Sequence, residues 1–181
     1  MNIQIGNFCL TEFDTQESAL FYELVHANRP RLEDYFAGTV AFTQTPTSTN
    51  KYCLKIEHRR LEKDYFPFVL KEKESGKFIA WVDVKNIDWR VPKAELGYFI
   101  DKDYEGMGLT SQAVSHVIDH IIEEHKFRKL LCRVNGGNTG SIHVALKNKF
   151  ELESSQNKMF GRASVIFIKY CLPVFSLRRH I

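Results

Sequence analysis

A glycine-bearing loop, Glu105–Thr110, is the part of this sequence whose residue types and spacing most directly suggest chemistry. It follows a strand-like stretch, Tyr98–Ile100, and precedes an amphipathic helical pattern that begins near Leu109. The first amides of a helix lack partners within the helix, the helix dipole places partial positive charge there, and glycine lets an anion approach the backbone. The loop therefore predicts a site for a phosphate group of a cofactor or substrate.

Two familiar types of phosphate loop fit these letters poorly. A Walker loop needs Lys-Ser or Lys-Thr after its last glycine, whereas Gly108 is followed by Leu109 and Thr110. A dinucleotide loop needs a third glycine where this chain has Ser111, and the segments before the loop have the pattern of antiparallel strands. A Gly-x-Gly pair also occurs in plain turns, where glycine serves only a backbone with positive φ. The residues around the loop must therefore indicate its ligand.

The elements that position this loop follow from hydrophobic periodicity and turn residues. Strands are predicted at residues 8–13, 65–73, 77–87, 94–100, 129–134, 151–155 and 164–171, and helices at 17–28, 31–36, 45–63, 109–125 and 138–149. Pro30 is placed at the start of the second helix, where proline is favoured. The order predicts a mixed α/β fold, a sheet of about seven strands flanked by helices, in one domain over residues 1–181.

The same loop resembles the coenzyme A pyrophosphate loop of the GNAT acetyltransferases, usually written Q/R-x-x-G-x-G/A. Gly108 holds the central glycine, while Glu105 and Thr110 depart from the outer positions. Other family-like segments occur in the same order, namely His26–Arg29 with Leu32, Ala94–Tyr98, Ser111–Ala113, and Asn135–Ser141 followed by Lys147 and Phe150. Over nearly its whole length the chain is similar to the RimJ/RimL-type branch, whose members acetylate the N-termini of ribosomal proteins.

This resemblance implies acetyl-CoA as co-substrate, no metal ion, and a mixed, mostly antiparallel sheet with one splayed pair of strands. Backbone groups of the splayed strand would bind the pantetheine arm, and the loop amides would bind the pyrophosphate. The cofactor-binding residues implied in this way are Tyr98, Phe99, Ile100, Glu105, Gly106, Met107, Gly108, Leu109, Thr110 and Asn138. The side chains of Phe99 and Ile100 also fit an ordinary sheet core.

Ser141 is the candidate acid. It lies in the first turn of the predicted helix 138–149, and the tyrosine that many GNAT enzymes carry one turn later is Ala145 here. The resemblance gives the Ser141 hydroxyl the role of stabilising or protonating the departing thiolate. A serine that merely begins a helix, and an Asn138 that merely caps it, are the alternatives.

Glu95 is the candidate base. Strand alternation puts it on the same face as Gly97 and Phe99, where a carboxylate could take a proton from an amine directly or through water. A structural glutamate that binds a neighbouring loop is the alternative.

The favoured acceptor is a protein N-terminal α-amine, such as that of a ribosomal protein, which would attack the thioester directly. A small-molecule amine is the alternative acceptor. Outside enzymes, the alternative is a non-catalytic acyl-CoA-binding regulatory protein, because Glu105, Thr110 and Lys149 (where the family usually has glycine before Phe150) depart from the pattern. Monomer and homodimer both remain open.

Composition sets further limits. The 181 residues are 44% apolar and 26% charged, as in ordinary globular proteins, and the net charge of +3 is too small to favour nucleic acid as a direct ligand. Four cysteines without C-x-x-C spacing favour reduced thiols in the cytoplasm, and no apolar run is long enough for a membrane span. His116 and His120 have metal-ligand spacing but lack a third ligand, so no metal site is predicted. Arg178–His180 is expected to be a solvated tail.

Overall fold

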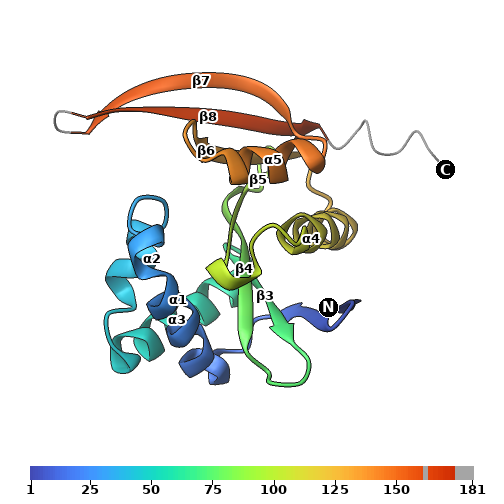
Figure 1. Ribbon diagram of the computed structural model, residues 1–181. Helices are drawn as coiled ribbons and strands as arrows, with labels where there is room; N and C mark the ends of the chain where they lie inside the picture. Colours follow the sequence, from blue (N-terminus) through green and yellow to red (C-terminus); the bar gives the residue numbers. More distant parts are fainter. Residues whose placement is uncertain (161–162, 174–181) are drawn as a thin grey trace.

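The strands form one sheet in the computed structural model, which describes residues 1–160 and 163–173 (Figure 1). They are β1 (Asn2–Ile5), β2 (Phe8–Glu12), β3 (Phe66–Glu72), β4 (Phe78–Asp88), β5 (Lys93–Ile100), β6 (Lys129–Asn135), β7 (Glu151–Phe160) and β8 (Ala163–Pro173). Their order across the sheet is β1-β2-β3-β4-β5-β6-β8-β7. The additional strand is β1, whose four residues are too few for alternation to reveal it. The basic end Arg178–His180 lies outside the described residues.

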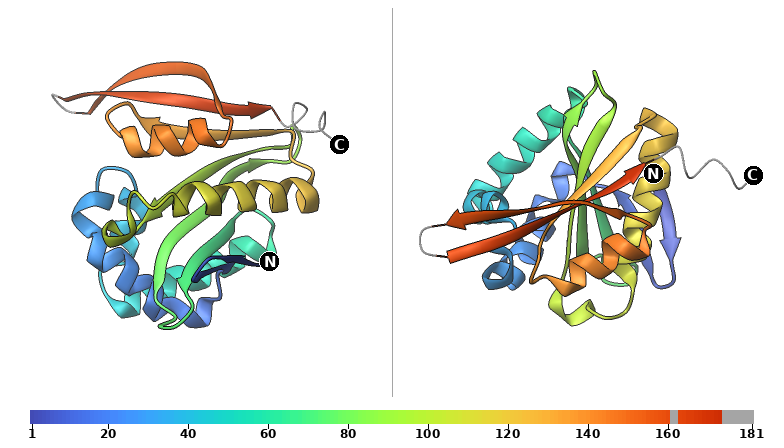
Figure 2. Two further views of the ribbon diagram at one scale, coloured as in Figure 1. Left: turned by 45° about the vertical axis from the view of Figure 1, so that its right-hand side comes forward. Right: turned by 90° about the horizontal axis from the view of Figure 1, so that it is seen from above.

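The α-helices of the described chain cover both faces of this sheet (Figures 1 and 2). They are α1 (Ser18–Leu32), α2 (Ala37–Phe42), α3 (Pro46–Leu61), α4 (Leu109–His125) and α5 (Thr139–Lys147). Alternation along β4 and β5 divides the core, because Trp81 and Phe99 pack on the α1–α3 side, whereas Val82 and Tyr98 pack on the α4 side. The predicted mixed α/β fold is confirmed. None of these helices is long and apolar enough to cross a membrane.

The first helix runs further than the sequence predicted. We expected a break before Pro30 and a second helix over residues 31–36, but α1 continues to Leu32 with Pro30 inside its last turn. Proline removes one backbone hydrogen bond, yet the helical pattern continues after it, because the Glu33 amide donates to the Arg29 carbonyl at 3.1 Å. Burial of Leu32 at 5% exposure holds this last turn against the core.

The sheet divides at the one place where neighbouring strands run parallel. All adjacent pairs are antiparallel except β5 and β6, whose pairing runs from Lys93 opposite Lys129 to Leu96 opposite Cys132 and ends there. The ladder of β5 with β6 therefore does not extend to residues 97–100, and β6 continues beyond Cys132 in its pairing with β8. The hairpin of β7 and β8 crosses steeply over the other strands (Figure 2). The predicted splayed pair is confirmed.

Candidate active site

A cleft of about 1130 Å³ opens where β5 and β6 separate. Its walls come from β5, β6, the starts of α4 and α5, and the chain between α1 and α2. All of the residues predicted for the site except Met107 line this cleft, namely Glu95, Tyr98, Phe99, Ile100, Glu105, Gly106, Gly108, Leu109, Thr110, Asn138 and Ser141. Met107 is 57% exposed and does not line the cleft, so only its backbone can belong to the loop's binding surface.

The loop before α4 has the backbone geometry of an anion site. Gly106 and Gly108 adopt φ values of +75° and +72°, and Gly108 is the N-cap of α4. Among the described residues, none accepts a hydrogen bond from the amides of residues 106–111. Lys147 of α5 adds positive charge, since its Nζ lies 3.8 Å from where a Cβ on Gly108 would be. The loop therefore fits a diphosphate group such as that of coenzyme A.

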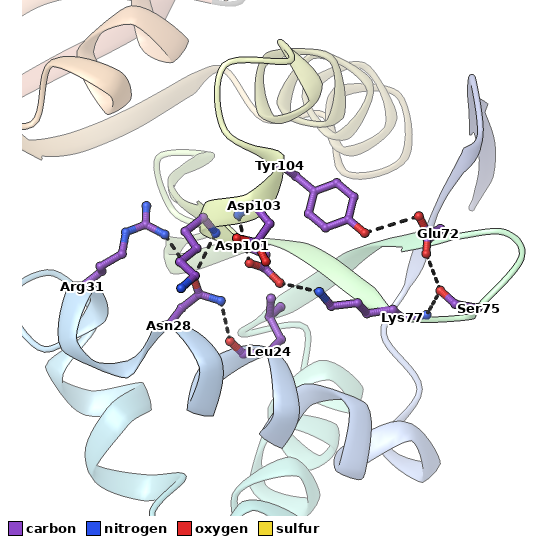
Figure 3. A network of polar contacts seen from close by, with 10 residues as sticks. Leu24, Asn28, Arg31, Glu72, Ser75, Lys77, Asp101, Asp103 and Tyr104 are labelled. Atoms are coloured by element: carbon purple, nitrogen blue, oxygen red, sulfur yellow. Dashed lines mark hydrogen bonds and ion pairs between the residues drawn. The ribbon is translucent and has the colours of Figure 1, made fainter.

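Buried Asn28 fastens this loop to α1 (Figure 3). Its side-chain oxygen accepts from the Lys102 amide and from Nη1 of Arg31, each at 3.0 Å. A short 3-10 helix, Lys102–Tyr104, follows, and Asp101 before it pairs with Lys77, which directly precedes β4, at 2.8 Å. The chain just before the loop is therefore held both by α1, through Asn28, and by Lys77 beside β4.

Glu105, which stands where the family pattern has Gln or Arg, forms an ion pair with Nη2 of Arg31. Both side chains are partly exposed, Arg31 at 41% and Glu105 at 53%. The carboxylate in the cofactor loop is thus offset by a cation from α1.

The start of α5 is fixed by two hydrogen bonds. The Asn138 side chain accepts from the Ser141 amide at 2.9 Å, which confirms Asn138 as the N-cap. The Tyr98 hydroxyl donates to the Ser141 carbonyl oxygen at 2.9 Å and so ties α5 to the splayed strand. Ser141 is thereby placed on the cleft wall at a helix N-terminus, where partial positive charge favours an anion.

Glu95 lies in the other half of the cleft and is 9% exposed. Its Oε2 accepts from Nε and Nη2 of Arg133 at 2.7 and 2.6 Å, and from Nδ2 of Asn86 at 3.1 Å. Within the described chain no donor contacts Oε1. The predicted base is therefore fixed in orientation through one oxygen, while the other remains open to a ligand.

An ion pair between buried Asp83 and half-buried Lys85 lies next to Glu95. Asp83 is 2% exposed, and its Oδ1 lies 3.2 Å from Nζ of Lys85, while its Oδ2 accepts from the Tyr65 hydroxyl at 2.6 Å. Burial opposes the protonated form of Lys85, but the Asp83 carboxylate outweighs this and raises the pKa of Lys85. The pair packs over Gly97 of β5, where a Cβ would lie 2.4 Å from Oδ1 and 2.6 Å from Nζ. Position 97 therefore requires glycine, because any side chain there would collide with Asp83 and Lys85.

Four cationic residues on the cleft wall were not predicted as site residues from the sequence, namely Arg31, Lys85, Arg133 and Lys147, although Lys147 is among the family-like residues. A signal was present for Lys85, because Asp83 and Lys85 occupy alternate positions and Asp83 interrupts the apolar run of residues 78–84. The other three lie on elements that only the fold brings to the cleft.

Two buried thiols are held neutral. Burial raises the pKa of Cys53 to about 12 and raises that of Cys132, which lines the cleft. The four cysteines are free of disulfide bonds. The described residues contain no group of three or more His, Cys, Asp or Glu side chains able to hold a metal ion.

The separated strands and the glycine loop before α4 define an α/β protein with a cleft beside a helix N-terminus. Residues 7–151 match the family model of the acetyltransferase (GNAT) domain. The chain is 28% identical over 135 residues to the ribosomal-protein-serine acetyltransferase of Escherichia coli (strain K12), covering 73% of this chain and 72% of that protein.

Solved structures agree in fold. The ribosomal-protein-S5-alanine acetyltransferase of Vibrio fischeri superposes with a TM-score of 0.85 at 19% identity, covering 96% of both chains. RimL, a ribosomal L7/L12 alpha-N-protein acetyltransferase solved with coenzyme A, gives a TM-score of 0.84 at 17% identity, covering 96% of this chain and 98% of that one. This protein belongs to the acetyltransferase (GNAT) domain family and is an acetyltransferase.

Proposed function

We propose that this protein is an acetyl-CoA-dependent N-acetyltransferase whose acceptor is the N-terminal α-amine of a protein, such as a ribosomal protein, in the cytoplasm. The observation that carries the proposal is the separation of β5 from β6 directly beside the loop of Gly106 and Gly108. One feature offers an edge of β5 beyond the end of its ladder with β6, and the other offers amides at the start of α4, and a cofactor with an amide-bearing arm and a diphosphate matches both. The ribosomal-protein acceptors named for the relatives support the choice of acceptor.

The cofactor residues divide by chemistry. The backbone of residues 98–100 would bind the amide-bearing arm as a strand partner, and the amides of residues 106–110 would bind the diphosphate. Asn138 lies near the same wall, and Lys147 adds a cation beside the loop. Together, these backbone and side-chain groups would orient the thioester toward the part of the cleft where Glu95 lies.

Acetyl-CoA supplies the acetyl thioester, and the acceptor must attack it as a neutral amine. Glu95 takes the amine proton on Oε1, directly or through water, because Arg133 and Asn86 hold its Oε2. Ser141 acts at the other end of the reaction. Its hydroxyl, at the N-terminus of α5, stabilises or protonates the departing thiolate.

Two measurements test this function. Calorimetry with acetyl-CoA and coenzyme A tests cofactor binding, and thiol release tests turnover with peptides bearing a free α-amine, peptides bearing only a lysine ε-amine, and small amines. We expect binding, and turnover with α-amine peptides. Turnover with small amines alone would instead support the alternative acceptor, and binding without turnover on any amine would support a regulatory acyl-CoA-binding protein.

A further inference from the structure

The cleft wall contains a cross-strand pair of opposite charge. Lys85 of β4 stands directly opposite Glu95 of β5 in the strand register, and both line the cleft. Side chains opposite each other in an antiparallel pair lie on the same face, within reach of one small ligand. The proposed chemistry uses Glu95 and leaves Lys85 without a role.

The Lys85 ammonium is held in place by a carboxylate and an aromatic ring. Its Nζ lies 3.2 Å from the buried Asp83 carboxylate and 5.1 Å from the centroid of the Phe36 ring. Tyr65 and Trp81 donate to the other Asp83 oxygen at 2.6 and 3.3 Å, so that carboxylate is fixed in turn. A fixed ammonium costs a ligand little ordering entropy when it binds.

Lys85 retains donors for a ligand. An ammonium group has three N–H donors, and within the described chain Asp83 is the polar partner of Nζ. The side chain is 28% exposed and lines the cleft. Its raised pKa keeps it protonated, so it acts as a hydrogen-bond donor rather than as a base.

A donor cation opposite an open carboxylate oxygen matches a ligand with an amine and a carbonyl oxygen close together. The α-amine of a peptide has this arrangement, since the carbonyl of the first residue is attached to the same carbon as the amine. A lysine ε-amine and a simple alkyl amine have no carbonyl near the nitrogen. The Lys85–Glu95 pair is therefore complementary to an α-aminoacyl group.

The geometry points to Lys85 as a specificity-determining residue, which donates a hydrogen bond to the carbonyl oxygen of the acceptor's first residue while Glu95 receives its amine. This inference rests on the proposed function and deepens it, because it says why an α-amine is preferred over other amines. Asp83 is the positioning residue for Lys85, and Gly97 leaves the room that both side chains occupy.

The test compares two acceptors in four proteins. The acceptors are a peptide amide with a free N-terminal alanine and an N-acetylated peptide whose single amine is a lysine ε-amine. The proteins are the wild type, Lys85→Met, the charge-balanced double variant Asp83→Asn/Lys85→Met, and Lys93→Met. Lys93 is a matched control, a cation of β5 that pairs with Asp88 outside the cleft. The double variant covers the case in which Lys85→Met fails to fold because Asp83 is left buried and unpaired.

We expect kcat/KM for the α-amine peptide to fall about 10-fold to 100-fold in both Lys85 variants, as for a lost hydrogen bond to a charged group. Turnover of the ε-amine peptide and calorimetric affinity for coenzyme A should stay at wild-type values, and Lys93→Met should change neither. An unchanged preference between the two peptides in a folded Lys85 variant would overturn the inference. A wild type that acetylates only small amines would instead overturn the proposed function itself.

Discussion

Arg31 and Glu105 lie 74 positions apart in the sequence and form an ion pair that joins α1 to the cofactor loop. An acidic side chain beside the proposed diphosphate would be unfavourable unless a cation offset it, and Arg31 is placed to be that cation. Because both side chains are partly exposed, the pair contributes little to folding stability. Its effect is expected in cofactor affinity.

Removing the Arg31 cation should reveal how strongly the Glu105 carboxylate opposes coenzyme A binding. Arg31→Gln is expected to weaken coenzyme A binding about 3-fold to 10-fold, since Glu105 is then unpaired beside the diphosphate. Glu105→Gln should leave the affinity unchanged or improve it, and the double variant should recover most of the loss. Calorimetry on the three variants gives the coupling energy. A strong loss in Glu105→Gln would show that this carboxylate serves the cofactor in another way.

Gly108→Val should lower coenzyme A affinity about 10-fold or more, because a β-branched side chain then stands at the diphosphate loop and disfavours its positive φ. Gly76→Val is the matched control. Gly76 has φ +71°, nearly that of Gly108, but lies in the turn between β3 and β4 with no atom near its Cβ position. Both variants should lose about 1–2 kcal/mol of stability. Equal coenzyme A affinity in the two would contradict an anion site at Gly108.

Ser141→Ala separates chemistry from helix capping. If the hydroxyl acts on the departing thiolate, kcat should fall about 10-fold to 10⁴-fold with little change in acetyl-CoA affinity, and Ser141→Cys should restore part of the rate. Asn138→Ala provides the contrast, since it removes the cap that accepts from the Ser141 amide and should cost about 1 kcal/mol of stability. A Ser141→Ala variant with full kcat would show that Ser141 is not needed, and the proton transfers would then fall to Glu95 acting through water.

The pH dependence of stability should report His125, whose ring stacks on Phe66 with centroids 4.2 Å apart. Burial, and secondarily the charge of His120, lower the pKa of His125 below 6.5. A lowered pKa means that the fold favours the neutral ring, so protonation favours unfolding. Against His125→Phe, which keeps an aromatic ring, the wild type should lose urea stability as the pH falls from about 6.5 through the folded-state pKa. A constant difference from pH 8 to pH 5 would contradict this, as these values bracket the titration of an ordinary histidine.

Most of the fold was predictable because its periodic segments are long. The helix predicted over residues 109–125 matches α4, the strand predicted at 65–73 contains β3, and the strand predicted at 77–87 covers β4 except its last residue, Asp88. The differences arose where a local rule was outweighed by packing, as at Pro30 in α1. Lys149 is a related case. It stands where the family usually has glycine, and the chain keeps the left-handed backbone there with φ +63° despite the side chain.

The candidate site was predictable where it consists of one continuous segment. Gly106 and Gly108 could be recognised from the loop itself, because their use depends on backbone geometry that neighbouring residues encode. Arg31 and Lys147 could not, since α1 and α5 meet the loop only after folding. The buried partners of Lys85 likewise depend on the register of β4 against β5. Cations drawn from distant elements leave no local pattern in a sequence.

The short parallel pairing of β5 and β6 also bears on how the molecule opens in solution. Because that ladder ends at Leu96 and Cys132, few main-chain bonds join strands β1–β5 to strands β6–β8. An amide hydrogen of Phe99 or Ile100 that points toward β6 should exchange with solvent quickly in the free protein and slowly once a pantetheine arm lies along it. Opening between the two groups of strands should therefore need less free energy than opening within either group. The boundary between β5 and β6, where the cofactor is proposed to bind, is then the part of the sheet that opens most easily.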